Sequence, residues 1–182
     1  MGQEKQAGNA KLICGLIYRD AAVRDEALQR LQAEFGAVED RSPEYPFTFT
    51  DYYRAEMGDG LIRQFVSFRG WLDPAALADA KRATNRIERE FAEKSGETFL
   101  RRVNLDPGYI TAAKFVLATT KDFSHRVYLR DGIHAEVTLQ FGSAGPRVQP
   151  WTYPDFASGV YSDFLMLVRR RVLPVAGAPR HP

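Results

Sequence analysis

The order of apolar and polar positions defines a strand and a helix at the start of the chain. Residues 11–18, KLICGLIY, form a nearly continuous apolar run, which is typical of a central strand covered on both faces. Apolar residues then recur every three or four positions over 21–35, which predicts a helix. We expect Asp20 to cap this helix and Gly36 to end it.

Two strands and a second helix follow. The pattern predicts a short strand near 47–53 and another at 61–69, with Gly58 and Gly60 in the turn between them. Asp73-Pro74 predicts a helix start, because aspartate is a good cap and proline suits the first turn. We expect Gly96 to end this helix, whose apolar stripe is Leu77, Ala80, Thr84, Ile87 and Phe91.

A half-buried strand is predicted at 101–106, where apolar and polar residues alternate. Val103 and Leu105 fall on one face, and the other face carries Arg102, Asn104 and Asp106. We expect Asp106-Pro107-Gly108 to break the strand, because proline cannot donate to a ladder and glycine permits a sharp turn.

These elements predict the fold class. The order strand, helix, strand, strand, helix, strand is that of an α+β, ferredoxin-like βαββαβ antiparallel sheet with both helices on one face. A C-terminal β-hairpin and a helix at about 160–172 extend it. Thr111 can cap a helix over 112–119, although the β-branched residues there support a strand almost as well.

Side-chain parity predicts the register of the hairpin near Gly132. A three-residue loop at 130–132, with Gly132 at positive φ, pairs Leu129 with Ile133 and Val127 with Ala135. This register places Arg126 across from Glu136, close enough for a charge-assisted contact.

Length and composition indicate one globular domain. The 182 residues predict a single domain at 11–173 between flexible tails at 1–10 and 174–182. The net charge of +2 is small, and part of the excess is the run Arg169-Arg170-Arg171, which complements the end of the last helix. We therefore do not expect a nucleic-acid partner.

The single cysteine and the apolar runs bear on the compartment. Cys14 lies in an apolar strand, where a buried, inert thiol is expected, and it has no partner for an internal disulfide. No apolar stretch approaches the length of about 20 residues that crosses a membrane, and the N-terminus does not resemble a signal peptide. We therefore expect a cytoplasmic protein that does not bind membranes.

Several nucleotide and phosphate motifs are excluded. The chain has no GxxxxGK[ST] loop, and Gly58-Asp59-Gly60 lacks the third glycine and the helix of a dinucleotide fingerprint. Thr120-Lys121-Asp122 has its aspartate one residue too early for the guanine-reading element of GTPases. The triplets that begin at His125 and His134 are not the His-x-Ser/Thr pairs of two-histidine phosphoesterases.

Four blocks of sequence resemble a known family. They are FTFTDYY at 47–53, RVNLDPGY at 102–109, ATTKDFSHR at 118–126 and WTYPD at 151–155. Together they resemble the bacterial family called domain of unknown function 4416, and the likeness runs over about 11–168. The resemblance implies a bacterial single-domain protein and says nothing about its substrate. The GTP-binding label of some members is not supported, because the phosphate loop is missing.

A cluster of polar residues is the candidate site. We expect Lys121 and Arg126 to bind a small anion, such as a phosphate or carboxylate, with His125 or Asp122 as a catalytic proton carrier. Further ligand-binding candidates are Lys114, Glu136, Asn104, Asp106, Tyr52 and Tyr53, the tyrosines as phenol donors or a stacking surface. Binding or turnover of a small anionic metabolite is therefore the favoured function.

Two other functions stay open. A metal-dependent enzyme would use His125, Glu136, Asp106 and Asp122, which suit iron, manganese or zinc. No spacing signature supports that set, so we assign no metal ligand and leave the cofactor open. Trp151 and Tyr153 beside an open sheet face offer a non-catalytic assembly or dimerisation surface, so a homo-oligomer also stays open.

Overall fold

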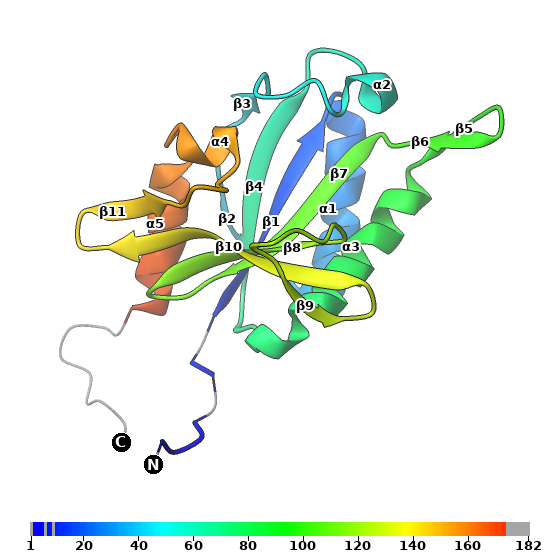
Figure 1. Ribbon diagram of the computed structural model, residues 1–182. Helices are drawn as coiled ribbons and strands as arrows, with labels where there is room; N and C mark the ends of the chain where they lie inside the picture. The colour runs from blue at the N-terminus through cyan, green and yellow to red at the C-terminus, as the bar shows by residue number, and fades with distance from the viewer. Residues whose placement is uncertain (1, 6, 9, 174–182) are drawn as a thin grey trace.

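The computed structural model describes residues 2–5, 7–8 and 10–173, and the predicted C-terminal tail at 174–182 lies outside them. The chain has the predicted α+β architecture, with helices packed on an antiparallel sheet (Figure 1). Ala10, which we expected in the N-terminal tail, is buried and pairs with Leu72 in an isolated bridge. Among the described residues, no helix is both long enough and apolar enough to span a membrane.

The main sheet has the strand order β11-β10-β8-β7-β1-β4-β2, and every neighbouring pair is antiparallel. Its strands are β1 (Lys11–Tyr18), β2 (Val38–Arg41), β4 (Ile62–Phe68), β7 (Val103–Ile110), β8 (Lys114–Thr119), β10 (Ile133–Gly142) and β11 (Gly145–Val148). Two short strands pair at its margins, β3 (Tyr45–Pro46) with β4 and β9 (Val127–Arg130) with β10. A separate hairpin consists of β5 (Glu93–Ser95) and β6 (Thr98–Leu100).

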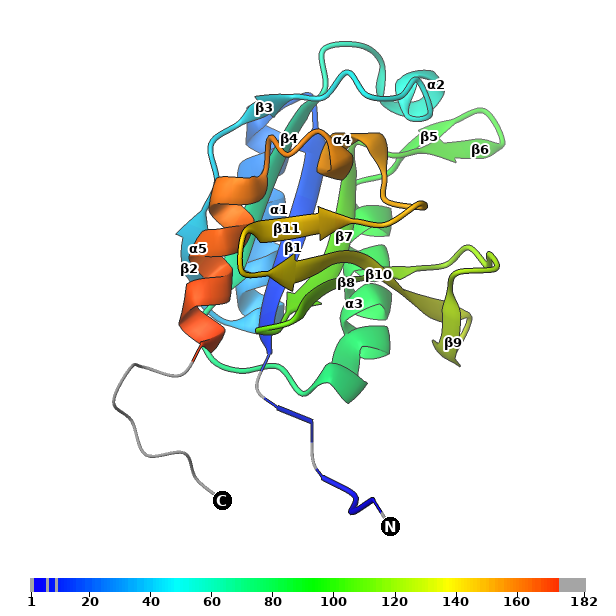
Figure 2. The same ribbon diagram turned by 60° about the vertical axis from the view of Figure 1, so that its left-hand side comes forward.

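Helices cover both faces of the sheet. The two long helices α1 (Ala21–Phe35) and α3 (Leu77–Glu90) pack on one face, and α3 follows a 3-10 turn, η1 (Pro74–Ala76). The last helix, α5 (Ser162–Val172), packs on the opposite face, as Figure 2 shows. Two single-turn helices, α2 (Arg54–Met57) and α4 (Pro154–Ala157), lie in the loops beside one end of the sheet.

Strand β1 is the centre of the core, as its apolar run predicts. All eight of its residues are buried. Leu12, Cys14 and Leu16 face α1 and α3, whereas Ile13 faces the aromatic cluster under α5. Each large apolar side chain buried in this way contributes roughly 1.5–3 kcal/mol to folding.

The predicted helix caps are confirmed. The Asp20 carboxylate accepts from the Ala22 amide at 2.8 Å, and the Asp73 carboxylate accepts from the Ala75 amide at 2.9 Å. The prediction for Gly96 is wrong, because α3 ends at Glu90 and Gly96 lies at φ 61° in the turn between β5 and β6.

The predicted strand at 47–53 is also wrong. This segment is a loop, and the strands that pair with β4 on the side away from β1 are β2 and the two-residue β3, which the sequence pattern did not indicate. Phe47 is buried with Ile17 and Leu61 at the end of the sheet, so the aromatic residues of the loop fill a small core of their own. The aromatic residues that made this segment resemble a strand are therefore explained by packing in that small core, and the segment forms no strand ladder.

Strand β7 continues through Pro107 and Gly108 to Ile110, contrary to the predicted break. The N–H and C=O of Leu105 point away from β1, since Glu88 and Lys81 of α3 bind them. Pro107 has the same orientation, and pairing with β8 begins only at Gly108, so its missing N–H removes no ladder bond. The segment 112–119, which the sequence left open, contains strand β8.

The hairpin register is partly as predicted. Gly132 has φ 74° and Val127 pairs with Ala135, as expected. The prediction that Leu129 pairs with Ile133 is wrong, because Ile133 pairs with Arg130 across a two-residue turn. The register then shifts at an irregularity between Ile133 and His134, which restores the predicted parity in the rest of the hairpin.

Candidate functional site

A cavity of about 520 Å³ opens where β7 and β8 diverge. The two strands pair over only Gly108–Ile110 of β7, so the preceding part of β7 faces an open space instead of a neighbouring strand. The charged and amide side chains that line this space come from several elements: Arg63, Lys81, Asn85, Glu88, Arg101, Asn104, Asp106, Lys121, Glu136 and Asp155. Aromatic residues of the 47–53 loop and of the segment around α4 complete its wall.

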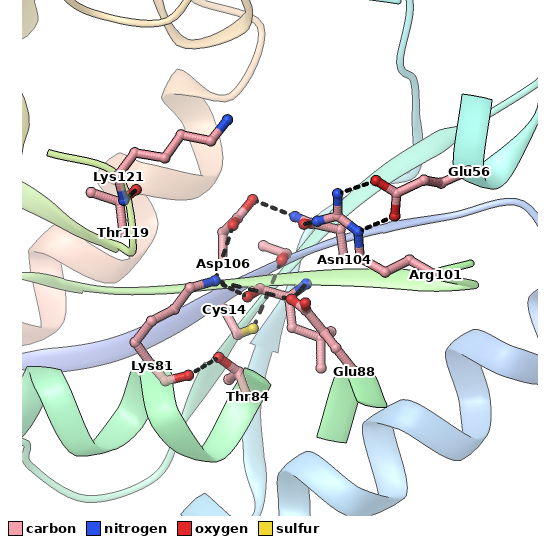
Figure 3. Close-up of polar contacts among 12 residues, drawn as sticks. Cys14, Glu56, Lys81, Thr84, Glu88, Arg101, Asn104, Asp106, Thr119 and Lys121 are labelled. Atoms are coloured by element: carbon pink, nitrogen blue, oxygen red, sulfur yellow. Dashed lines mark hydrogen bonds and ion pairs between the residues drawn. The ribbon is translucent and has the colours of Figure 1, made fainter. Parts of the chain in front are cut away.

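Helix α3 supplies the groups that satisfy the open edge of β7. Glu88 Oε1 accepts from the Leu105 amide at 2.6 Å, and Lys81 Nζ donates to the Leu105 carbonyl at 2.9 Å. The two side chains are seven residues apart and therefore lie on one face of the helix. Figure 3 shows both rising from α3 toward Asp106, with Arg101 on one side of it and Lys121 on the other.

Asp106 is the centre of the polar contacts. Its Oδ2 accepts from Arg63 Nη1 at 3.1 Å and from Asn104 Nδ2 at 2.8 Å, and its Oδ1 lies 3.5 Å from Lys81 Nζ. Burial alone would raise the pKa of Asp106, but the charges of Lys81 and Arg63 outweigh it and lower this pKa. Asp106 is therefore an ionised carboxylate, with a quarter of its side chain exposed to the cavity.

Gly15 makes room for the Arg63 guanidinium. Arg63 on β4 pairs with Ile17 of β1, whereas Asp106 on β7 pairs with Gly15, so the arginine must cross β1 to reach the aspartate. A Cβ at Gly15 would lie 2.6 Å from Arg63 Nη2. The guanidinium carbon lies 4.7 Å from the centre of the Phe65 ring, which the cation can contact favourably.

Arg63 is a buried cation with spare hydrogen-bonding capacity. Its exposure is 3%, and Nε has no hydrogen-bond partner among the described residues. Asp155, near the same guanidinium, is also buried, and burial raises its pKa against the opposing charge of Arg63. Both residues line the cavity.

Arg101 connects the loop helix α2 to β7. It donates to the two carboxylate oxygens of Glu56 at 2.7 and 2.8 Å, and to Asn104 Oδ1 at 2.9 Å. The hydrogen bonds from Arg101 lower the pKa of Glu56. The guanidinium also lies 5.4 Å from the Tyr53 ring centre, so it fixes the aromatic wall beside Asn104.

Lys121 reaches over the cavity from the loop after β8. Its Nζ lies 4.0 Å from the centre of the Tyr52 ring, and it forms no ion pair with any described residue. Contact with this ammonium lowers the pKa of the Tyr52 hydroxyl. Lys121 is therefore a cation beside the cavity that retains its capacity to bind an anion.

Six of the ten candidate residues from the sequence line this one cavity. They are Tyr52, Tyr53, Asn104, Asp106, Lys121 and Glu136. Three of the others lie outside its wall: Lys114 at the opposite end of β8, Asp122 with 78% of its side chain exposed, and His125. His125 stacks on Trp151, with ring centres 5.3 Å apart.

Arg126, the tenth candidate, is engaged by protein groups. Its Nε donates to Glu136 Oε2 at 2.9 Å, which is the cross-strand contact that parity predicted. Its other nitrogens donate to the Lys121 carbonyl at 3.1 Å and the Tyr153 hydroxyl at 2.6 Å. His125 Nε2 lies 3.2 Å from the same Glu136 oxygen.

No three histidine, cysteine, aspartate or glutamate side chains of the described residues are grouped closely enough to hold a metal ion. Of the four residues considered as metal ligands, Asp122 lies 3.6 Å from His134, and Asp106 is bound by Arg63 and Asn104. Of these four side chains, only His125 and Glu136 contact each other, so the four do not form one metal site among the described residues.

Sequence reasoning missed Arg63, Lys81, Glu88 and Asp155. The first three could have been recognised from the sequence, because each is a charged residue at a position that the hydrophobic pattern assigns to the core. Lys81 and Glu88 each follow a member of the apolar stripe by four residues, Leu77 and Thr84 respectively. A buried charge in a helix stripe or a core strand needs a partner, and the partner identifies the site.

The fold and the cavity define an α+β protein with a buried, charged pocket between two diverging strands. The chain belongs to the family described as Domain of unknown function (DUF4416), whose family model matches residues 8–171. This confirms the family resemblance of the four sequence blocks. The searches of curated proteins and of solved structures each found no match to this chain.

Proposed function

We propose that the cavity between β7 and β8 binds a small metabolite that carries an anionic group. The observation that carries this proposal is a cavity of about 520 Å³ whose wall holds buried charged side chains together with the ammonium group of Lys121. Cavities of this size with a few convergent polar groups are the usual form of small-molecule sites.

The buried charges support function over stability. Replacing a buried ion pair by apolar residues is often neutral or stabilising, so the ion pairs of Asp106 with Arg63 and Lys81 are weak evidence for a purely stabilising role. Buried charged groups with shifted pKa values are concentrated at functional sites. Asp106 is held in place by donors on three sides, which is the pre-organisation that binding requires.

Lys121 is the proposed anion contact. Arg126, which the sequence suggested, already donates to three protein acceptors and has a side chain that is almost fully buried. The contacts of His125 and Arg126 instead favour a positioning role, since both bind Glu136 on the cavity wall. Carboxylates of the wall can accept hydrogen bonds from hydroxyl or amino groups of the same ligand.

A thermal-shift screen tests this proposal. The panel contains inorganic phosphate, sugar phosphates, nucleoside monophosphates and dicarboxylic acids. At a concentration of about 100 Kd, a specific ligand stabilises the protein by roughly 2.7 kcal/mol and raises its Tm. We expect Lys121→Ala to reduce the shift. Lys114→Ala is the matched control, because it removes a lysine at the other end of β8, outside the cavity.

Two results contradict the proposal. One is that no member of the panel changes the Tm of the wild-type protein. The other is that Lys121→Ala responds to every binding compound as the wild type does, which would place the bound anion elsewhere.

We also propose that the segment from β1 to β7 is a ferredoxin-like unit. The strand order β7-β1-β4-β2, with α1 and α3 on one face, supports this assignment. A solved structure of a relative with the same order and connections would test it.

Self-association is a second candidate function. Four apolar side chains are exposed on or next to β9: Phe123, Val127, Tyr128 and Leu129. A cluster of exposed apolar side chains on an edge strand is typical of a surface that binds another protein chain. Light scattering over a range of protein concentrations tests this candidate, and a monomer mass at every concentration contradicts it.

A further inference from the structure

Glu88 and Asp106 are two carboxyl groups on the wall of one cavity in different surroundings. Asp106 is bound by Arg63 and Asn104 and has Lys81 3.5 Å away. Glu88 uses Oε1 to accept from the Leu105 amide, and Lys81 lies 4.0 Å from that same oxygen. No described residue donates a hydrogen bond to Glu88 Oε2.

The groups around Glu88 oppose its ionisation more than they favour it. Burial raises the pKa of Glu88, Lys81 and the Leu105 amide act against this, and the negative charge of Asp106 raises it further. The other titratable groups that face it are Arg101, which lowers the pKa, and the neutral Tyr53 and Cys14. Asp106 has the opposite balance and a lowered pKa. Neighbouring acids whose environments differ in this way commonly divide the roles of proton donor and charged partner.

We propose that Glu88 is a proton donor in a reaction of the bound metabolite, because it lines the cavity and its Oε2 has no donor among the described residues, while the Leu105 amide and Lys81 contact its other oxygen. The inference rests on the proposed function, since it needs a metabolite in the cavity, and it adds catalysis to binding. It also narrows the substrate class to metabolites with an oxygen or nitrogen atom that gains a proton as they react.

The step balances without a further reactant. The O–H bond at Glu88 Oε2 breaks, and the proton passes to the oxygen or nitrogen of the metabolite. The electron pair stays on Glu88 as a carboxylate, which the Leu105 amide and the Lys81 ammonium stabilise. Glu88 regains a proton from water or from the product. Asp106 stays ionised and keeps Arg63 and Lys81 in position.

Carbon-13 NMR of the side-chain carboxyl groups tests the protonation directly and needs no ligand. The Glu88 signal is assigned as the one that disappears in Glu88→Gln. We expect it to titrate above about 4.3, the ordinary glutamate value, because burial raises the pKa of this carboxyl group. Lys81→Met should move the Glu88 midpoint higher. A wild-type midpoint at or below the ordinary value overturns the proposal, whether or not Lys81→Met folds.

Turnover tests the catalytic role. Each panel compound that raises the Tm is incubated with the protein and followed by proton NMR. We expect conversion by the wild type and by Glu90→Gln, and a loss of about 100-fold or more in Glu88→Gln. The glutamine keeps an acceptor for the Leu105 amide, so the Tm shift on binding should be retained.

The two proposals fail in different ways. Bound compounds that the wild type leaves unchanged, or that Glu88→Gln converts at the wild-type rate, overturn the role of Glu88 and leave binding intact. A panel without any binding compound overturns the proposed function and this inference with it.

Discussion

Gly15 is the residue that allows the charged cluster to form. Its lack of a side chain lets Arg63 cross β1 and bind Asp106 at 3.1 Å. The sequence shows only a glycine inside an apolar strand, and the need for it appears once β4 and β7 are known to flank β1. By contrast, the placement of Asn104 and Asp106 on the face opposite Leu105 followed from alternation alone.

We predict that Gly15→Ala destabilises the protein by about 1–3 kcal/mol, because the added methyl group overlaps the Arg63 guanidinium. Urea denaturation measures the loss. Gly8→Ala is the control, since a Cβ there meets no atom within 4 Å. Equal stability of Gly15→Ala and the wild type would show that the arginine does not depend on this space.

Arg126 joins three segments that are distant in the chain. It binds Glu136 on β10, the carbonyl of Lys121 after β8 and the hydroxyl of Tyr153 before α4. Parity predicted the contact between Arg126 and Glu136. It could not predict the contact with Tyr153, because that depends on how the segment from β11 to α4 folds back over the sheet.

We predict that Arg126→Ala costs about 3–5 kcal/mol of unfolding free energy, because it leaves the buried Glu136 carboxylate without its main partner. Urea denaturation of the variant and the wild type measures this loss of unfolding free energy. Arg130→Ala should change stability little, since its contacts with Asp79 and Asp131 lie at the surface. Similar losses in the two variants would contradict the role assigned to Arg126.

The hairpin and β7 show where element prediction reaches its limit. Side-chain parity identified the residues that share a face, but it did not locate the irregularity that shifts the register between Ile133 and His134. Pro107 was expected to end its strand, yet it lies where β8 offers no ladder partner. Both outcomes depend on which strand is the neighbour, and that information is not local.

At the level of the whole chain, the sequence predicted the α+β class and the packing of both long helices on one face. It did not predict the cavity, because a cavity between β7 and β8 arises from where two strands separate. The lining combines residues from the 47–53 loop to Phe156, and only the three-dimensional pairing brings them together. Charged residues at positions that the hydrophobic pattern assigns to the core were the sequence feature that could have indicated the cavity.

The raised pKa of Glu88 predicts a pH dependence of stability. At a pH between the Glu88 pKa of the unfolded chain and that of the folded protein, the folded protein holds more protons. The contribution of Glu88 to the free energy of unfolding is therefore complete below the pKa in the unfolded chain, and it is lost as pH rises through the pKa in the folded protein. We therefore expect the stability of the wild type relative to Glu88→Gln to fall from about pH 4 upward. Urea titrations at a series of pH values measure this difference. A difference that stays constant or grows with pH would contradict it.

Asp106 should show the opposite dependence. Because its pKa is lower in the folded protein, ionised Asp106 stabilises the fold. This stabilisation is complete above the pKa of about 3.9 in the unfolded chain, and it is lost as pH falls through the pKa in the folded protein. The same titrations, extended below pH 4 and compared with Asp106→Asn, test this sign. A relative stability that increases on acidification would contradict the contacts described for Asp106.

A crystal structure with the strongest-binding phosphate compound of the panel tests the central claim most directly. We predict that the compound lies between β7 and β8, with a phosphate oxygen about 2.7–3.2 Å from Lys121 Nζ. The contrary result is a compound bound elsewhere, for example in the polar groove that Arg82, Arg86 and Arg89 line between α3 and the β9–β10 turn, with the cavity containing only water.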